Sequence, residues 1–408
     1  MSSRELQRSP SWGRRRVLLG VLTAPFANRQ AAGQVGAGGV VADTAARPGR
    51  VLAVGPKRTV QTLARAARLA ADGDTVEVDA GEYVGDVAVW TQDRLTVRAV
   101  GGRALLRAAG RSAEGKAIWV VRGGTMRIEG IDFTGARVAS RNGAGIRFER
   151  GQLVIDDCSF IDNENGILTA SDPEAVLEIE NSEFGHNGYG DGYSHNLYVG
   201  AIGMLTVTGC YFHHARVGHL LKSRAAQNHI LYNRLTDETG GAASYELEFP
   251  NGGIAFVVGN IIAQGLRSEN PLLVSYGAEG YLARPNVLTL VHNTLVDGVM
   301  TGGAFVFIRA GERRVLVANN LLVGDARFDT PAPGDYLNNF VAARGDFVAA
   351  DDYDFRLVRG AAVAGKVATM APVVDLGSVP QREYVHPRRT RSTASLALQP
   401  GAMQSLGS

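Results

Sequence analysis

The sequence predicts an all-β fold, a right-handed parallel β-helix in which short strands stack coil upon coil. A unit of alternating apolar residues recurs at intervals of 23 to 33 residues, and no helical periodicity separates the units. Two residues before the last large apolar residue of most units stands an Asn, Ser or Cys. A unit of this length cannot bury its own apolar face, so neighbouring units must stack on one another.

Eight such units follow one another in the middle of the chain. Their last large apolar residues, the anchors, are Phe133, Phe160, Phe184, Phe212, Leu235, Ile262, Leu295 and Leu322. The unequal spacing fits a coil whose loops can lengthen without breaking the strand ladder. A propeller blade, the alternative, needs about 40 residues and four antiparallel strands.

The residue two before each anchor predicts a polar ladder through the coils. After Ile131 in the first unit, this position holds Cys158, Ser182, Cys210, Asn233, Asn260, Asn293 and Asn320. Asparagine amides at equivalent turns can bond to the amides above and below and satisfy buried backbone groups. In this register the two cysteines lie two coils apart, roughly 9–10 Å, which is too far for a disulfide. We therefore expect two buried free thiols.

The two ends of the β-helix are expected to be capped, because an open strand edge invites pairing with other chains. Residues 59–71 have the pattern of an amphipathic helix, and residues 50–75 are predicted to cover the first coil. The β-helix is placed at residues 50–324, and residues 325–408 are predicted to form an irregular C-terminal cap.

The N-terminus has the pattern of an export signal over residues 1–32, followed by a linker at 33–49. Arg14, Arg15 and Arg16 precede an apolar run that ends at Leu22, an order similar to a twin-arginine signal. An ordinary basic signal region or an uncleaved anchor is the alternative. The run is shorter than the roughly 20 residues of a membrane span. The sequence predicts a bacterial periplasmic or secreted protein without a membrane span after the signal is removed.

Composition excludes other classes of protein. Of 408 residues, 45% are hydrophobic and 20% are charged, which suits a large buried core. The net charge is only +2 and no basic patch is interleaved with aromatic residues, so nucleic acid is not an expected partner. Two cysteines are too few for a disulfide scaffold or a cysteine metal site. We expect a monomer.

The helix, the segment from Gly73 to Tyr83 and the stacked coils resemble the pectate-lyase-like superfamily. Within it, the segment around Lys222 resembles polysaccharide lyase family six, the alginate lyase and chondroitinase B group. The resemblance implies that Lys222 is the general base. Glu248 stands where that family has an arginine, and Ala215 and Val217 stand where it has calcium ligands. We therefore expect no metal and no other cofactor, calcium being possible in such a family but not supported by these residues.

Three successive coils carry an unusual set of polar residues on one face. Alternation along a strand places Lys222 and Arg224 on one side, and Glu246 and Glu248 outward with Leu247 and Phe249 inward. The candidate catalytic residues are Lys222, His195, Tyr198, Arg224, Glu246, Glu248 and His219. The candidate substrate-binding residues are Asn196, Tyr193, Asp191, Asn251, Tyr276 and Arg309. Tyr276 and Arg309, together with Glu279, lie at comparable places in later coils and are expected to extend the binding groove.

This set of residues suits β-elimination or C5 epimerisation on a uronate. A cation neutralises the carboxylate, a base such as Lys222 removes the C5 proton, and Tyr198 or His195 protonates the leaving oxygen. Glu246, Glu248 or Asp191 could instead form the carboxylate pair of a glycoside hydrolase. A non-catalytic glycan-binding or surface structural protein, with the charges forming a surface ion-pair ladder, is the remaining alternative. The pair His213-His214 is expected in a solvated turn without a metal.

Overall fold

The computed structural model describes residues 49–299, 302–311, 313–328, 333–369 and 379–407. The predicted export signal and almost all of the predicted linker lie outside the described residues. Within the described ranges, no helix is both long enough and apolar enough to cross a membrane.

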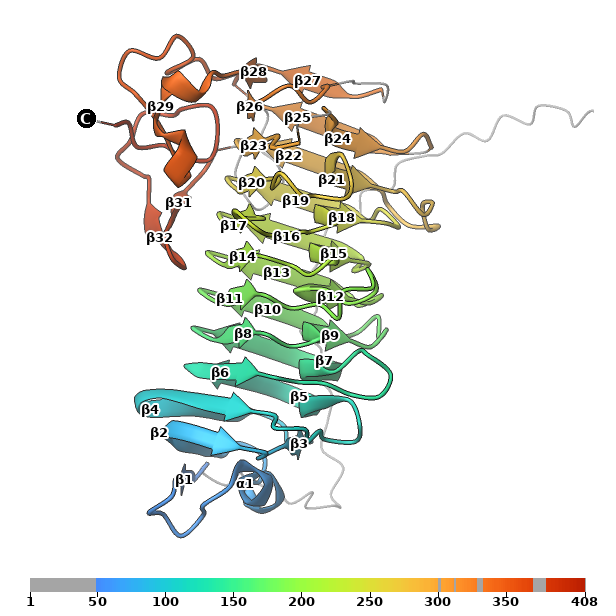
Figure 1. Ribbon diagram of the computed structural model, residues 1–408, viewed down its shortest axis with the longest axis vertical. Coiled ribbons are helices and arrows are strands. Elements are labelled where there is room, and N and C mark those ends of the chain that lie inside the picture. Colours follow the sequence, from blue (N-terminus) through green and yellow to red (C-terminus); the bar gives the residue numbers. More distant parts are fainter. Residues whose placement is uncertain (1–48, 300–301, 312, 329–332, 370–378, 408) are drawn as a thin grey trace, which may run out of the picture. The chain divides into compact units, whose positions relative to one another are not determined.

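Strands β1 to β28 form a parallel β-helix with three ladders of hydrogen-bonded strands (Figure 1). The first ladder runs through β1 (Val51–Val54), β2 (Thr75–Val84), β4 (Leu95–Arg107), β5 (Ala117–Glu129), β7 (Ala144–Asp156), β10 (Val176–Glu180), β13 (Met204–Thr208), β16 (Gln227–Leu231), β19 (Ile254–Val258), β22 (Val287–Val291), β25 (Arg314–Ala318) and β27 (Asp335–Leu337).

The second ladder follows the polar turn. It begins with the C-terminal halves of β2 and β4 and continues through β6 (Ile131–Thr134), β8 (Ser159–Ile161), β11 (Glu183–Gly185), β14 (Tyr211–His213), β17 (Arg234–Thr236), β20 (Ile261–Ala263), β23 (Thr294–Val296), β26 (Leu321–Val323) and β28 (Phe340–Val341). The third ladder contains β3 (Ala88–Trp90), the N-terminal halves of β5 and β7, then β9 (Asn165–Thr169), β12 (Leu197–Val199), β15 (His219–Ser223), β18 (Tyr245–Phe249), β21 (Leu272–Tyr276) and β24 (Ala304–Ile308).

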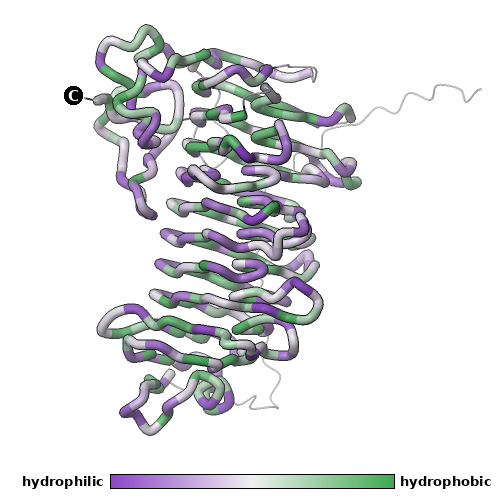
Figure 2. Tube along the Cα trace, viewed as in Figure 1, coloured by the Kyte–Doolittle hydropathy of each residue, from purple (hydrophilic) through white to green (hydrophobic). Residues whose placement is uncertain are grey.

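The apolar core fills the inside of the coils, as the alternation of the strands predicts. Hydrophilic and hydrophobic residues alternate along the strands in Figure 2. The anchors Phe133, Phe160, Phe184 and Phe212 are fully buried and stack ring on ring, with centroids 4.7 to 4.9 Å apart. This spacing equals the distance between neighbouring strands, about 4.8 Å, so equivalent residues of successive coils lie directly above one another. The parallel β-helix predicted from the sequence is confirmed.

The predicted polar ladder is present in the register that the sequence indicated. The amide oxygen of Asn293 accepts hydrogen bonds from the backbone N–H and the side-chain amide of Asn260, at 2.9 and 3.0 Å. The side-chain amide of Asn293 in turn donates to Asn320 at 3.0 Å and to the carbonyl of Val257 at 2.9 Å. The ladder extends one coil beyond the prediction, because Asn339 accepts from Asn320 at 2.8 Å.

Cys158 and Cys210 belong to this ladder and are free, as predicted. Ser182 lies between them: its hydroxyl accepts from the backbone N–H of Cys158, and its own N–H donates to the sulfur of Cys210 at 3.4 Å. Complete burial raises the pKa of both thiols to about 12, so they stay protonated at neutral pH.

A second polar ladder, which was not predicted from the sequence, runs through the turn between the second and third ladders. The amide oxygen of Asn163 accepts from the N–H of Ala136, and that of Asn187 accepts from the N–H of Asn163. Asn196 continues the series, because its amide oxygen accepts from the side chain of Asn187 at 2.8 Å. Asn163, Asn187 and Asn196 are all completely buried.

The first coil is covered by α1 (Leu63–Leu69), which is shorter than the predicted 59–71. Its N-terminus is fixed by Thr62, whose hydroxyl accepts from the N–H of Arg65 at 3.2 Å. Asp86 accepts from the N–H groups of Leu63 and Ala64. Leu63, Ala66 and Ala67 form the buried face of the helix.

The chain after β28 forms η1 (Arg344–Asp346), β29 (Phe347–Ala349), η2 (Ala350–Asp352), β30 (Asp354–Leu357), β31 (Arg382–Val385) and β32 (Arg389–Ser392). This C-terminal segment lies along the second ladder rather than only across its end. Arg388 donates to the carbonyl of Cys158 at 2.9 Å, and the N–H of Gly401 donates to Asn319 at 2.8 Å. Phe347, Phe355 and Tyr384 cover the apolar outer side of Ile261, Val296 and Leu321.

Replacing Asn293 with alanine should strongly destabilise the β-helix. The change leaves the N–H of Asn260 and the carbonyl of Val257 buried without partners, each costing about 1–3 kcal/mol. Urea unfolding should show the loss as a lower midpoint. Asn293→Ser introduces serine, which occupies the equivalent ladder position at Ser182, and should destabilise the protein less than alanine does. An alanine variant within about 0.5 kcal/mol of the wild type would contradict the structural role of the ladder.

Candidate functional site

The third ladder carries a column of outward side chains across successive coils. The register aligns Arg147 with Leu168, Leu168 with Tyr198, Tyr198 with Lys222, and Lys222 with Glu248. The strands are parallel and in register, so these side chains lie in adjacent coils. The prediction that Tyr198, Lys222 and Glu248 come together on one face is therefore correct.

Lys222 lies between two carboxylates. Its Nζ is 3.0 Å from Oε2 of Glu248 and 3.1 Å from Oε1 of Glu279. Nε2 of His219 also contacts Oε2 of Glu248, at 2.8 Å. Burial alone would raise the pKa of Glu248, but the hydrogen bond from His219 and the charge of Lys222 hold it below its usual value. Burial lowers the pKa of His219, so a neutral imidazole donates to an ionised carboxylate.

Arg224 joins Glu279 to the aromatic part of the site. Its guanidinium binds both carboxylate oxygens of Glu279, at 2.7 and 2.9 Å, and also donates to the amide oxygen of Asn251. Nε of Arg224 donates to the hydroxyl of Tyr198 at 2.9 Å. The hydrogen bond from Arg224 is the main reason why the pKa of Glu279 falls to about 2. Burial raises this pKa by a smaller amount, and the bond from Lys222 lowers it further. Glu279 had been predicted only to extend the groove, and the structure places it at the centre.

His195 is buried beneath this cluster. It is only 3% exposed, and its Nδ1 accepts a hydrogen bond from the backbone N–H of His219 at 2.9 Å. Its ring stacks on Tyr198 and lies edge-on to His219, with centroids 5.4 and 4.6 Å apart. Burial moves its pKa well below the usual value. In this position His195 packs against Tyr198 and holds its ring in place, and it is too deeply buried to contact a substrate.

The prediction that Glu246 points outward is wrong, because Glu246 is completely buried. The strict alternation assumed for the strand fails where the third-ladder strands begin: Leu220 and Leu221 of β15 are both fully buried, and β18 aligns with β15 there. Burial, with the nearby Asp237, raises the pKa of Glu246 well above its usual value. Burial also raises the pKa of Asp237 to about 7.

Two predicted substrate-binding residues are inside the protein. Asn196 is completely buried because its amide belongs to the second polar ladder, with a bond to the carbonyl of His213 at 2.8 Å. Tyr276 is also completely buried, and its hydroxyl donates to the carbonyl of Gly253. In the described conformation neither side chain can contact a substrate, so both predictions are wrong.

The other predicted binding residues are at the surface but do not form one group. Tyr193 is 87% exposed, and Asp191 accepts from its backbone N–H at 3.1 Å. Asn251 lies beside Arg224. Arg309 is exposed in a later coil, where it donates to the carbonyl of Ala278 at 3.0 Å. The structure brings Asn251 to the site and leaves Arg309 at its margin.

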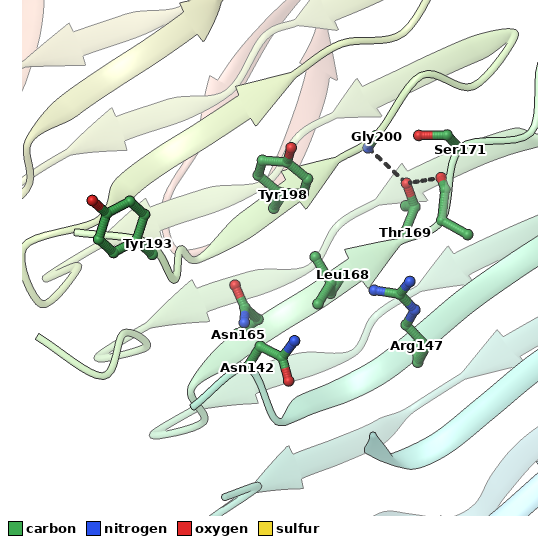
Figure 3. Close-up of a pocket in the computed structure, with 10 residues that line it drawn as sticks. Asn142, Arg147, Asn165, Leu168, Thr169, Ser171, Tyr193, Tyr198 and Gly200 are labelled. Carbon is green, nitrogen blue, oxygen red and sulfur yellow. Dashed lines mark hydrogen bonds between the residues drawn. The ribbon is translucent and has the colours of Figure 1, made fainter. Parts of the chain in front are cut away.

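A pocket of about 340 Å³ opens beside Tyr198 on the N-terminal side of the cluster (Figure 3). It is lined by Asn142, Arg147, Asn165, Leu168, Thr169, Ala170, Ser171, Tyr193, Tyr198 and Gly200. Arg147 was not predicted from the sequence, although it stands in an otherwise apolar run between Ile146 and Phe148.

Two hydrogen-bond donors in this pocket lack partners. Among the described residues, nothing accepts from the buried Nε of Arg147 or from Nδ2 of Asn165, which is 1% exposed. Burial lowers the pKa of Arg147, against weaker effects of Glu149 and Tyr198 in the opposite direction. Unpaired buried donors are costly, so the pocket is suited to a group rich in acceptor oxygens.

No family model matches the sequence, and no curated protein matches it either. Among solved structures, pectate lyase Pel9A is similar over 88% of this chain and 96% of its own, with a TM-score of 0.57 and 13% identity. A pectin methylesterase in complex with a hexasaccharide has a TM-score of 0.36, and the pectin methylesterase of Aspergillus niger has 0.31, each at 11% identity. The first similarity covers 74% of this chain and 91% of the methylesterase chain. The second covers 72% of this chain and 86% of the methylesterase chain. The likeness to Pel9A shows that both chains share a parallel β-helix fold.

The ion pairs of Glu279 should make part of the stability depend on pH. Its folded-state pKa of about 2 lies below the usual 4.5, so its contribution is complete above pH 4.5 and is lost as the pH falls towards 2. Glu279→Gln should therefore be less stable than the wild type at neutral pH, by less than about 1 kcal/mol because the carboxylate is 45% exposed. Thermal unfolding between pH 7 and pH 2 should show the gap closing below pH 4.5.

The matched control for this experiment is Glu269→Gln, which changes an exposed carboxylate in the preceding turn. It should leave the pH dependence of the wild type unchanged. A gap between wild type and Glu279→Gln that stays constant down to pH 2 would contradict the assignment.

Proposed function

We propose that this protein acts on an acidic polysaccharide, binding a uronate-containing chain along the outward face of the third ladder and removing a proton from C5 of one sugar. The observation that carries the proposal is the position of Glu279. Its carboxylate is bound by Arg224 through two bonds and by Lys222 through one. These cations form a receptor for one planar carboxylate group.

The carboxylate of Glu279 makes the contacts with Lys222 and Arg224 that we expect a substrate carboxylate to make. It is the most exposed member of the cluster and lies in the loop after β21, whereas Lys222 and Glu248 are 13% and 4% exposed. A uronate carboxylate can exchange with Glu279 without disturbing the buried pair of His219 and Glu248. The exchange preserves the charge balance of the site.

Arg147 provides a second anchor for the same polymer. It lies three coils before Lys222 on the same column, a distance of roughly 14 Å at the usual strand spacing. Its guanidinium and Nδ2 of Asn165 have free donors in the pocket beside Tyr198. A chain of acidic sugars along the column would place one carboxylate at Arg147 and another at Arg224.

Tyr198 lies between the two anchors and is the group best placed to transfer a proton. Its hydroxyl oxygen accepts from Nε of Arg224, which leaves the hydroxyl proton free to point towards the pocket. In β-elimination the phenolate of Tyr198, beside the Arg224 guanidinium, takes the C5 proton, a C4–C5 double bond forms, the C4–O bond breaks, and the phenol returns the proton to the leaving oxygen. In epimerisation the phenolate takes the C5 proton and water supplies a proton to the opposite face of C5.

The sequence assigned the role of base to Lys222. Its two ion pairs fit the neutralisation of the substrate carboxylate better, because a base must have a free lone pair. We therefore assign carboxylate binding to Lys222 and Arg224 and proton transfer to Tyr198. In both assignments the increased acidity of C5–H comes from cations fixed beside the carboxylate.

The fold supports this class of substrate, since Pel9A, which has the same fold, is described as a pectate lyase. Polymers of this kind lie outside the cytoplasm, so the proposal agrees with the predicted export signal and a periplasmic or secreted location. A hydrolase using a pair of carboxylates is less favoured, because Glu246 is completely buried and Glu248 is held by His219 and Lys222.

Incubation with polygalacturonate, alginate and glycosaminoglycans should release an unsaturated product from one of them, measured by its ultraviolet absorbance. Tyr198→Phe should lower kcat by about 10²–10⁴-fold, since it removes the transferable proton. Lys222→Ala should raise KM as well as lower kcat. Arg98→Ala, which removes an exposed ion pair with Glu77 near the N-terminal end, is the matched control and should have wild-type activity.

Without an unsaturated product, proton NMR of the recovered polymer would show a change at C5 if the protein is an epimerase. Saturable binding of an acidic polymer without either product would identify a glycan-binding protein instead. Full activity in Tyr198→Phe would contradict the assigned proton transfer.

Arg147→Ala should weaken binding of acidic polymers while leaving the chemical step largely intact. Loss of one charge-assisted contact is worth about 1.5–3 kcal/mol, or roughly a tenfold to hundredfold increase in KM. Arg147→Lys keeps the charge but not the fork of donors, and should recover part of the affinity. A change in kcat with KM unaltered would contradict a purely anchoring role.

A further inference from the structure

Three imidazoles form a cluster on the turn between the second and third ladders, separate from the candidate site. His186 follows β11, and His213 and His214 lie at the end of β14 in the next coil. One ring nitrogen from each of the three lies within 4.8 Å of the others. The rings of His186 and His214 stack with centroids 4.6 Å apart, and that of His213 is edge-on to both.

The partners of His213 and His214 determine which nitrogen of each ring carries the proton. Nε2 of His213 is 3.2 Å from the carboxylate of Glu183, and Nε2 of His214 is 3.4 Å from the carbonyl of Thr239. A carbonyl oxygen only accepts, and so does an ionised carboxylate. Both Nε2 atoms are therefore donors, and in the neutral rings both Nδ1 atoms carry lone pairs.

These two lone pairs face each other. Nδ1 of His213 and Nδ1 of His214 are 2.8 Å apart, too close for two acceptors with nothing between them. Two imidazole nitrogens bound to one tetrahedral zinc ion, each at about 2.0–2.1 Å, lie roughly 3.3–3.4 Å apart. A shift of roughly half an ångström would therefore bring both nitrogens to the positions of two ligands of one ion.

We propose that His186, His213 and His214 bind a single divalent transition-metal ion of the class that prefers imidazole, such as zinc. The bond from His213 to Glu183 matches the carboxylate partner that orients a metal-ligating histidine through its other ring nitrogen. His213 is buried, whereas His214 is half-buried and His186 exposed, so the site is open to ions from solution. Nearby Arg216 is paired with Asp162 at 2.8 Å, which reduces its repulsion of a cation.

The backbone around the cluster also makes room for these rings. A side chain at Gly185 would lie 2.2 Å from a ring carbon of His213 and 2.4 Å from its Nε2. Glycine is therefore required at this place if His213 is to occupy its position between two coils. The bound ion would link two successive coils, because His186 belongs to one and His213 and His214 to the next. The proposal departs from the sequence-based expectation of a solvated turn without a metal.

Isothermal titration of zinc into the full-length protein, purified without a histidine tag and stripped with a chelator, tests this site. We expect one equivalent of zinc to bind and to raise Tm. His186→Ala and His214→Ala, whose rings are not deeply buried, should weaken binding by more than about 100-fold, and Glu183→Gln by about 10–100-fold. Cobalt in place of zinc should give visible absorption bands that these variants lose.

His229→Gln is the matched control, since His229 lies on β16 and its ring is tilted against that of Phe256, with centroids 5.4 Å apart, rather than lying in the cluster. It should bind zinc like the wild type. No zinc binding by the wild type would overturn the proposal and leave a proton shared between His213 and His214. Unchanged binding in both His186→Ala and His214→Ala would also overturn it, because the zinc would then be held elsewhere.

Discussion

The in-register stacking of parallel coils determines every other feature of this molecule. Each coil leaves backbone N–H and carbonyl groups unpaired where it turns, and these groups are inaccessible to water. The amides of Asn233, Asn260, Asn293 and Asn320 bond to the turn above and the turn below. A buried side chain that makes bonds to two neighbouring turns can do so in only one register. The same register then places the outward residues of the third ladder in columns.

The candidate site follows from this geometry. Tyr198, Lys222 and Glu248 come from three different coils, separated in sequence by more than twenty residues, and meet because each occupies the same place in its strand. Rigid backbone on both sides keeps the cations at fixed distances from one another. A site of this kind needs little reorganisation when a charged substrate binds.

The repeat and the ladder could be predicted from the sequence because both depend on periodicity. Asn339 continues the same pattern and could have been found by extending it. Glu246 could not be placed correctly, since the two successive inward residues at the start of β18 depend on how the strand enters the coil. Glu279 was recognised only as a possible extension, because its ion pairs with Lys222 and Arg224 span more than fifty residues of sequence.

Some strands of the later coils are apolar on both faces, which strict alternation of inward and outward residues does not explain. Ile261, Ile262 and Ala263 are all buried, although alternation predicts that two of them face solvent. A strand that is apolar on both faces requires a covering layer, and the C-terminal segment provides it. Asn196 shows the reverse case, in which a polar residue in a polar loop is taken into the interior by a second amide ladder.

The contacts of the C-terminal segment affect how the molecule can come apart. A stack whose coils touch only their neighbours can fray from either end. Here Arg388 bonds to Cys158 across 230 residues of sequence, while Gly401 bonds to Asn319 in one of the last coils. The C-terminal segment therefore ties a coil in the middle of the stack to one of the last coils. The residues that close this loop are synthesised after every coil that they contact, so a growing chain forms those coils before they are tied together.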